Sequence, residues 1–204
     1  MFEGYHLSTY IIMIAVVSFC GFLVENIWLA FTKGYIDNRN MNAPFLLGYG
    51  LLLVAFYLIF GTPKKMRLFG KACPVSRRLG QYALYFAAAF LVVSFCEVLL
   101  GSVVEWLCKV EVWNYTRLPL HITKYTSIPT STGFAAIIFV AMNSVFTPLM
   151  NGLEGISASF AIPLSVVLLV ILVGDFLVNA VRIYQTQSLY TLWRKDFNNS
   201  GILC

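Results

Sequence analysis

Four of the nine acidic side chains of this sequence fall inside long apolar segments, where a charge is unfavourable. They are Glu25, Glu97, Glu105 and Asp175. An acid at the centre of a membrane helix costs about 2.5 to 3.5 kcal/mol on insertion scales, so it usually faces the interior of a helix bundle and marks a pathway or a partner. The pattern therefore indicates polar chemistry within an apolar protein.

The pattern Gly-x-x-Val-Glu occurs twice, at Gly21 to Glu25 and at Gly101 to Glu105. A spacing of four residues places each glycine and its glutamate on one face of a helix, and Glu97 extends the second face. Because small residues let helices approach closely, we expect the two polar faces to meet. The alternative is that the acids lie near helix ends, in interfacial water.

A polar loop with chemistry-bearing side chains follows each glutamate. Arg39 could clamp an anionic group bidentately, and Trp113 with Tyr115 could wall a flat ligand, although tryptophan and tyrosine are also enriched at membrane interfaces. Tyr49 lies between two glycines, which is typical of close helix packing or of a broken helix that lines a cavity. The predicted ligand-binding residues are Glu25, Asn38, Arg39, Tyr49, Glu105, Trp113, Asn114 and Tyr115.

A secondary polar face is predicted from Glu97, Asp175, Asn179 and Arg182. The last three follow one another at i, i+4 and i+7, so they share a helix face. For these three we favour local pairing at a helix end, with Arg182 reaching the interface, over a ligand site.

The composition is that of an integral membrane protein. Of the 204 residues, 59% are hydrophobic and only 11% are charged, whereas soluble domains carry about 25% charged residues. The mean hydropathy is +0.79. We expect one all-α transmembrane domain over residues 1–204. Five apolar segments predict its helices, at about 9–31, 45–60, 82–107, 132–149 and 156–181, and the amphipathic stretch 184–193 is a candidate sixth helix.

Six of the fourteen basic residues lie in the loop 61–80, which contains no acid. The positive-inside rule places this loop and the N-terminus in the cytoplasm, and the bacterial cytoplasmic membrane is the predicted location. The basic residues of the C-terminal region argue for the opposite orientation, and a sixth helix would remove that conflict. The clustering indicates lipid head groups rather than nucleic acid as the partner of these charges.

The matching motifs predict an internal repeat of two helices, with repeat A at about 9–60, repeat B at about 82–149 and a fifth helix at about 156–181. Phosphate-loop, HExxH and GxSxG motifs are missing from the sequence. We therefore expect no nucleotide hydrolysis by this chain, no metal site and no cofactor, and we favour a protein that is not an enzyme.

These residues resemble a known family. Glu25, Asn38-Arg39, Pro44 and Tyr49-Gly50, followed by Glu105, Trp113-Asn114-Tyr115 and Pro119, are similar to the motifs of bacterial type IV ABC-transporter permeases, also called CmpB-like. The sequence departs from them where Asn40 replaces a glycine, Leu47 a proline and Asn114 an aspartate. The resemblance implies a membrane transport component that works with a separate ATPase.

The leading hypothesis is thus a permease subunit that handles a small polar or anionic ligand. Its expected partners are the lipid bilayer, a cytoplasmic ATPase subunit, the ligand and a further copy of the chain, but not nucleic acid. One alternative is a membrane-embedded enzyme that uses the paired carboxylates on a lipid or isoprenoid substrate. Another is an accessory or scaffold subunit without a ligand of its own.

Overall fold

Five helical segments make up most of the computed structural model, which describes residues 4–197. The fourth segment, residues 128–154, changes from an α-helix to a π-helical turn and back, so it carries three labels. In chain order the helices are α1 (Leu7–Lys33), α2 (Leu47–Phe60), α3 (Arg78–Cys108), α4 (Ile128–Val140), the π-helix η1 (Ala141–Val145), α5 (Phe146–Glu154) and α6 (Ala158–Thr186).

The five predicted helices are confirmed, and the predicted bounds are close to the observed ones. The candidate sixth helix at residues 184–193 is not observed. Helix α6 continues to Thr186 and ends at Gln187, whose φ of 49° is left-handed. Residues 188–193 are not helical, and the chain then enters a strand. The amphipathic pattern of 184–193 did not predict the structure correctly, because the amides of Tyr190 and Leu192 bond to the loop after α1.

Short antiparallel strands connect and close the helices. Strand β1 (Tyr35–Asp37) pairs with β7 (Arg194–Asp196), although most of the chain separates them. Strands β2 (Gly61–Thr62), β3 (Lys65–Leu68) and β4 (Lys71–Ala72) form a three-stranded sheet between α2 and α3. Strands β5 (His121–Thr123) and β6 (Thr126–Ser127) form a hairpin before α4.

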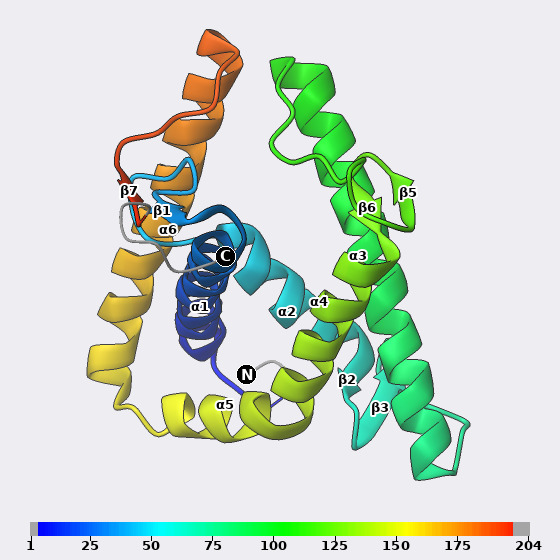
Figure 1. Cartoon of the computed structure of the whole chain (residues 1–204). Helices are drawn as coiled ribbons and strands as arrows, with labels where there is room; N and C mark the ends of the chain where they lie inside the picture. Colours follow the sequence, from blue (N-terminus) through cyan, green and yellow to red (C-terminus); the bar gives the residue numbers. More distant parts are fainter. Residues whose placement is uncertain (1–3, 198–204) are drawn as a thin grey trace. The chain divides into compact units, whose positions relative to one another are not determined.

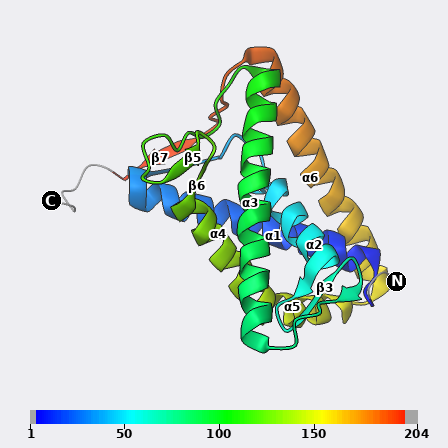
Figure 2. The same cartoon turned by 90° about the vertical axis from the view of Figure 1, so that its right-hand side faces the viewer.

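The chain divides into two compact units, which we describe separately. Unit 1 contains residues 1–52 and 153–204, and unit 2 contains residues 53–152. In unit 1, α1 packs against α6, and the β1–β7 pair lies beside them (Figure 1). In unit 2, α3 packs against α4 (Figure 2).

The surface of the helices is that of a membrane protein. Four helical segments of the described residues are long and apolar enough to cross a membrane: 7–33, 78–108, 128–154 and 158–186. Helix α2 is apolar but shorter. Large apolar side chains such as Leu91 on α3 and Val170 on α6 are about two-thirds exposed, at 65% each. Apolar surface of this extent requires a covering, and lipid provides it for spanning helices.

Helices α1 and α3, which carry Glu25 and Glu105, each lead into a polar loop. Helix α1 is capped by Gly34, whose φ of 70° redirects the chain into β1. Helix α3 is capped by Lys109, which adopts a similar left-handed conformation with φ 59°. Left-handed residues commonly terminate helices because they satisfy the last carbonyl groups, and glycine does so without steric strain. Both loops therefore begin with the same backbone device.

Candidate ligand site

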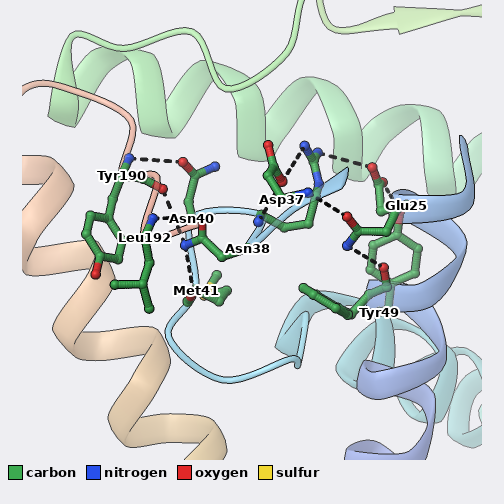
Figure 3. Close-up of polar contacts among 11 residues, drawn as sticks. Glu25, Asp37, Asn38, Asn40, Met41, Tyr49, Tyr190 and Leu192 are labelled. Carbon is green, nitrogen blue, oxygen red and sulfur yellow. Dashed lines mark hydrogen bonds and ion pairs between the residues drawn. The ribbon is translucent and has the colours of Figure 1, made fainter. Parts of the chain in front are cut away.

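In unit 1, Glu25 is the centre of a polar cluster that includes a tyrosine and an arginine. The Tyr49 hydroxyl donates a hydrogen bond to Glu25 Oε1. Arg39 Nη2 donates to Glu25 Oε2 over 3.1 Å, and Arg39 Nη1 lies 3.8 Å from Asp37 Oδ1. Figure 3 shows Glu25, Tyr49 and Asp37 in this cluster. We call Glu25, Tyr49, Arg39 and Asp37 the first cluster.

The loop after α1 is shaped so that Arg39 reaches back to Glu25. Arg39 and Asn40 both have left-handed backbones, with φ of 52° and 63°. Asp37 Oδ1 accepts a hydrogen bond from the Arg39 amide at 2.8 Å, which stabilises the turn. The buried Asn26 side chain accepts from the Asp37 amide at 2.8 Å. Helix α1 therefore positions both acids of the first cluster, one directly and one through Asn26.

Unit 2 contains a matching arrangement around Glu105. Lys124 Nζ donates to Glu105 Oε1, and the Tyr125 hydroxyl donates to Glu105 Oε2 over 2.5 Å. Lys124 also lies 3.0 Å from Glu111 Oε1. We call Glu105, Tyr125, Lys124 and Glu111 the second cluster. Each cluster thus joins a helix glutamate to a tyrosine hydroxyl, a cation and a second carboxylate.

The glycine of each Gly-x-x-x-Glu pattern makes room for the tyrosine ring. A Cβ atom at Gly21 would lie 2.6 Å from Tyr49 Cγ, and one at Gly101 would lie 2.4 Å from Tyr125 Cδ1. Both distances are too short for carbon atoms in contact. A Cβ at Gly50 would lie 2.3 Å from the Ile14 carbonyl oxygen, so the predicted close packing at the start of α2 is observed at Gly50.

Alanine at Gly21 or at Gly101 is expected to destabilise the protein. Overpacking a close contact costs about 1–3 kcal/mol, so Gly21→Ala and Gly101→Ala should each lower the melting temperature in detergent. Gly174→Ala in unit 1 and Gly133→Ala in unit 2 are matched controls, because a Cβ at either position meets nothing within 4 Å. In a helix interior, these controls should be neutral or stabilising. Equal effects in all four variants would contradict the close fit of the rings.

The residues after α3 support the second cluster in different ways. Trp113 Nε1 donates to the Tyr125 carbonyl oxygen over 2.9 Å, and the two rings meet edge to face at 5.9 Å. Asn114 Nδ2 donates to Glu111 Oε2 over 3.0 Å. The Tyr115 amide donates to the Lys124 carbonyl oxygen over 2.8 Å. The three predicted residues therefore all lie beside the cluster and hold its loop.

The pKa values of Glu111 and Lys124 define the pH range over which the second cluster stabilises the fold. The hydrogen bond from Asn114, followed by that from Lys124, lowers the pKa of Glu111 below its ordinary 4.5. The hydrogen bonds to Glu105 and Glu111 raise the pKa of Lys124 above its ordinary 10.5. A lowered acid pKa stabilises the fold above 4.5 and loses this contribution as the pH falls through the folded-state pKa. A raised lysine pKa stabilises it below 10.5 and loses the contribution as the pH rises through the folded-state pKa.

We therefore expect the stabilisation from Lys124 to be constant at neutral pH and to fade in acid. The melting temperatures of wild type and Lys124→Met should differ by a fixed amount at neutral pH. The difference should shrink as the pH falls below 4.5 and through the lowered pKa of Glu111, because protonation of its carboxylate removes the ion pair with Lys124. A difference that grows in acid would contradict the assigned ion pairs.

Asn38 is placed differently from the other predicted residues. It is only 2% exposed. Its Nδ2 donates to the Met41 carbonyl oxygen at 2.8 Å, and its Oδ1 accepts from the Leu192 amide at 3.0 Å. Asn40 Oδ1 accepts from the Tyr190 amide in the same segment at 3.1 Å (Figure 3). Asn38 thus fastens the first-cluster loop to the segment after α6.

The predicted secondary face divides between the two units. In unit 1, Asp175 accepts hydrogen bonds from the amides of Asn42 and Ala43 at 3.1 and 3.0 Å, so α6 holds the loop after Arg39. Asn179 donates to Asp175 at 2.8 Å, and Arg182 donates to Asn179 at 3.3 Å. This face is therefore more than local helix-end pairing. In unit 2, Glu97 accepts from Thr126 at 2.8 Å and from Ser131 at 3.3 Å.

Sequence reasoning missed several members of the clusters. Asp37, Glu111, Lys124 and Tyr125 were not predicted as site residues, and neither was Asn26, which holds the Asp37 amide. A usable signal existed, since a tyrosine follows each helix glutamate by a similar interval, 24 residues for Tyr49 and 20 for Tyr125. The two cations carried no such signal because Arg39 precedes its tyrosine by ten residues and Lys124 directly adjoins its own.

Comparison with known proteins identifies the family of this chain. A search of curated proteins and a search of solved structures each find no match. A family model described as "Putative ABC-transporter type IV" matches residues 12–180, which include both clusters and most of the five helices. The match agrees with the motif resemblance and with the apolar helices of the structure. The chain is an integral membrane protein and belongs to this ABC-transporter family.

Proposed function

We propose that the protein is the membrane-spanning permease subunit of an ABC-type transporter and that its two clusters bind a small polar ligand. The observation that carries the proposal is the duplicated arrangement of glycine, glutamate, tyrosine, cation and second carboxylate. A single cluster of this kind could serve the fold alone. Two copies, each on the polar face of a membrane helix, support a shared role, because charged groups at such positions usually serve a pathway or a ligand.

The duplication also supports the internal repeat. Gly21 and Glu25 on α1 correspond to Gly101 and Glu105 on α3, and Tyr49 corresponds to Tyr125. Transport proteins are often built from repeated units that bind their substrate between equivalent elements. Under this proposal, repeats A (9–60) and B (82–149) each carry one ligand-binding cluster.

The charges of the clusters restrict the chemical class of the proposed ligand. The first cluster has the carboxylates of Glu25 and Asp37 around Arg39, and the second has those of Glu105 and Glu111 around Lys124. Each therefore carries two negative charges and one positive charge. This balance supports the polar alternative from the sequence and gives no support to the anionic one, since a free anion would meet net negative charge. Among the described residues, the buried Arg39 Nε is left without an acceptor, which suits a ligand with a hydrogen-bond acceptor.

Ligand binding can be tested without knowing the ligand. The purified protein, incubated with the small-molecule fraction of a cell extract, would be examined by native mass spectrometry. Wild type should retain a low-mass adduct that Glu25→Gln and Glu105→Gln each lose. Glu154→Gln is the matched control, because Glu154 bonds Thr9 at 2.6 Å and belongs to neither cluster. An adduct that survives both cluster substitutions would overturn the binding site.

The sequence has no phosphate-binding loop, and under this proposal a separate ATPase supplies the energy for transport. We propose a cytoplasmic ATPase, with the N-terminus and the loop 61–80 on the cytoplasmic side of a bacterial membrane. Purification in mild detergent from the native host should yield a nucleotide-hydrolysing partner. Co-purification should persist in Glu25→Gln, which separates subunit assembly from ligand binding. Repeated purification without any ATPase would overturn the ABC-type mechanism.

A further inference from the structure

The sheet between α2 and α3 combines an exposed apolar turn at its tip with exposed lysines at both ends of β3. We call residues 61–72, which contain β2, β3 and β4, the basic hairpin. At its tip, Leu68 is 51% exposed and Phe69 is 76% exposed. Lys71 is exposed next to this turn, Lys64 and Lys65 are exposed at the other end of β3, and the hairpin contains no acidic residue. Exposed aromatic and aliphatic groups flanked by lysines are typical of segments that lie at a membrane surface.

The backbone at the tip is unfavourable for the residue that it carries. Leu68 pairs with Lys71, so Phe69 and Gly70 are the two central residues of the turn. Their φ values are 47° and 81°. A two-residue hairpin turn with both φ values positive favours Asn-Gly or Asp-Gly, and a bulky residue in this region is an outlier. The turn thus holds an apolar ring in an exposed position against both solvation and backbone preference, which indicates a function for the ring.

The opposite side of the basic hairpin is anchored, so the direction of its tip is fixed. Met66 is 8% exposed and Pro63 is buried. The Tyr85 hydroxyl of α3 donates to the Gly61 carbonyl oxygen over 2.9 Å. The Arg67 guanidinium lies 5.4 Å from the centre of the Tyr57 ring on α2. The hairpin is therefore a positioned element of unit 2 rather than a free loop.

The basic hairpin lies alongside the N-terminal end of α3 (Figure 2). Helix α3 has 31 residues, which corresponds to a length of about 46 Å at 1.5 Å per residue. The hydrocarbon core of a bilayer is about 30 Å thick, so the ends of α3 extend into the head-group layers. Arg77 and Arg78 are exposed at this end, and the neighbouring Leu79 is 82% exposed. The same mixture of cations and apolar groups thus continues from the hairpin onto the helix.

We propose that the basic hairpin and the start of α3 form a docking surface for anionic phospholipids. Lys64, Lys65 and Lys71 bind the head-group phosphates together with Arg77 and Arg78, and Phe69 inserts into the interface beneath them. Charge complementarity selects anionic lipid, and the exposed apolar tip distinguishes a lipid surface from an acidic protein surface, which would leave the ring in water. This inference goes beyond the ligand site and does not depend on it.

The test compares melting temperatures in nanodiscs of phosphatidylcholine alone and of phosphatidylcholine mixed with phosphatidylglycerol. Wild type should melt several degrees higher with the anionic lipid, because a ligand that binds only the folded state stabilises it. The variant Lys64→Gln/Lys65→Gln/Lys71→Gln should lose most of this shift. The control variant Lys33→Gln/Lys109→Gln/Arg117→Gln should keep it, since it removes three other exposed cations.

The variant Phe69→Asn separates the role of the ring from the folding of the turn. Asparagine suits the left-handed position, so this variant should melt at or above wild type in phosphatidylcholine alone. It should nevertheless show a reduced shift with phosphatidylglycerol. Loss of stability in both lipids would mean that the ring serves the fold, and the insertion of Phe69 would be wrong.

The remaining outcomes also decide the proposal. An equal lipid shift in wild type and the triple lysine variant, or no shift in wild type, would overturn it. Inorganic phosphate added to the neutral nanodiscs should have no effect, and a matching shift would assign the cations to a free anion. A normal lipid response in the hairpin variants, combined with loss of a co-purifying ATPase, would make the basic hairpin a protein-docking surface instead. No residue of the two clusters is changed, so failure here leaves the proposed function untouched.

Discussion

Arg39→Met is expected to melt well below the wild-type protein. Removing one partner of a buried ion pair costs about 3–5 kcal/mol, because the other charge is left uncompensated. The Arg39 and Glu25 side chains remain 23% and 22% exposed, so solvent reduces the effect, and we expect about 2 kcal/mol. For a chain of this size, that corresponds to a decrease of roughly 4–8 °C in the melting temperature measured in detergent.

A second variant shows whether the uncompensated carboxylates cause this loss. Glu25→Gln/Arg39→Met removes both charges of the pair, so it should regain a large part of the lost stability. Arg117→Met is a suitable control, because Arg117 is an exposed arginine of unit 2. If Arg39→Met melts like wild type, the ion pair contributes nothing to the fold. If the double variant is as unstable as the sum of the single ones, the two side chains act independently.

Asn38→Leu is expected to release the segment after α6 from the loop that carries Arg39. Leucine has a similar size but leaves the Leu192 amide and the Met41 carbonyl group without the bonds that Asn38 makes. An unsatisfied buried polar group costs about 1–3 kcal/mol, so the two together should lower the melting temperature by several degrees. Hydrogen exchange at the backbone amides of residues 190–196 should become faster in this variant.

The exposed Asn114 provides the comparison for this effect. Asn114→Leu also removes side-chain hydrogen bonds, to Glu111 and to the Thr116 amide, but water can replace them, so we expect a small loss. A chain shortened after Ser188 should reproduce the instability of Asn38→Leu. If hydrogen exchange at residues 190–196 is unchanged in Asn38→Leu, the β1–β7 pairing holds this segment without the help of Asn38.

The sequence was sufficient to predict the helices because their signal is local. Each helix is an apolar run bounded by polar residues, and length alone separates a spanning segment from a shorter one. The glutamates could be recognised as unusual for the same reason, since Glu25 and Glu105 each stand out from an apolar run. The spacing from each glycine to its glutamate predicted a helix face suited to close packing. It did not predict that a tyrosine ring would pack there.

The parts that could not be predicted depend on contacts between distant segments. Nothing near Asn38 in the sequence shows that its partner is the Leu192 amide, and a polar residue after a helix is equally suited to a ligand. Lys124 lies in a loop that looks like any exposed turn until Glu105 is placed beside it. The stretch 184–193 has a helical pattern, yet pairing of Arg194–Asp196 with β1 draws its end away from a helix.

The division of the chain has a consequence for its biosynthesis. Unit 2 is a continuous stretch, residues 53–152, whereas unit 1 combines residues 1–52 with residues 153–204. A ribosome releases α1 and β1 first, but the partners of both, α6 and β7, emerge only after the whole of unit 2 has been made. Unit 2 can therefore assemble during synthesis, before α1 has its partner α6. Glu25 and Arg39 are both present at this stage, because they lie close together in the sequence. Early pairing of these two charges would compensate the charge of the glutamate in the membrane before α6 has been made.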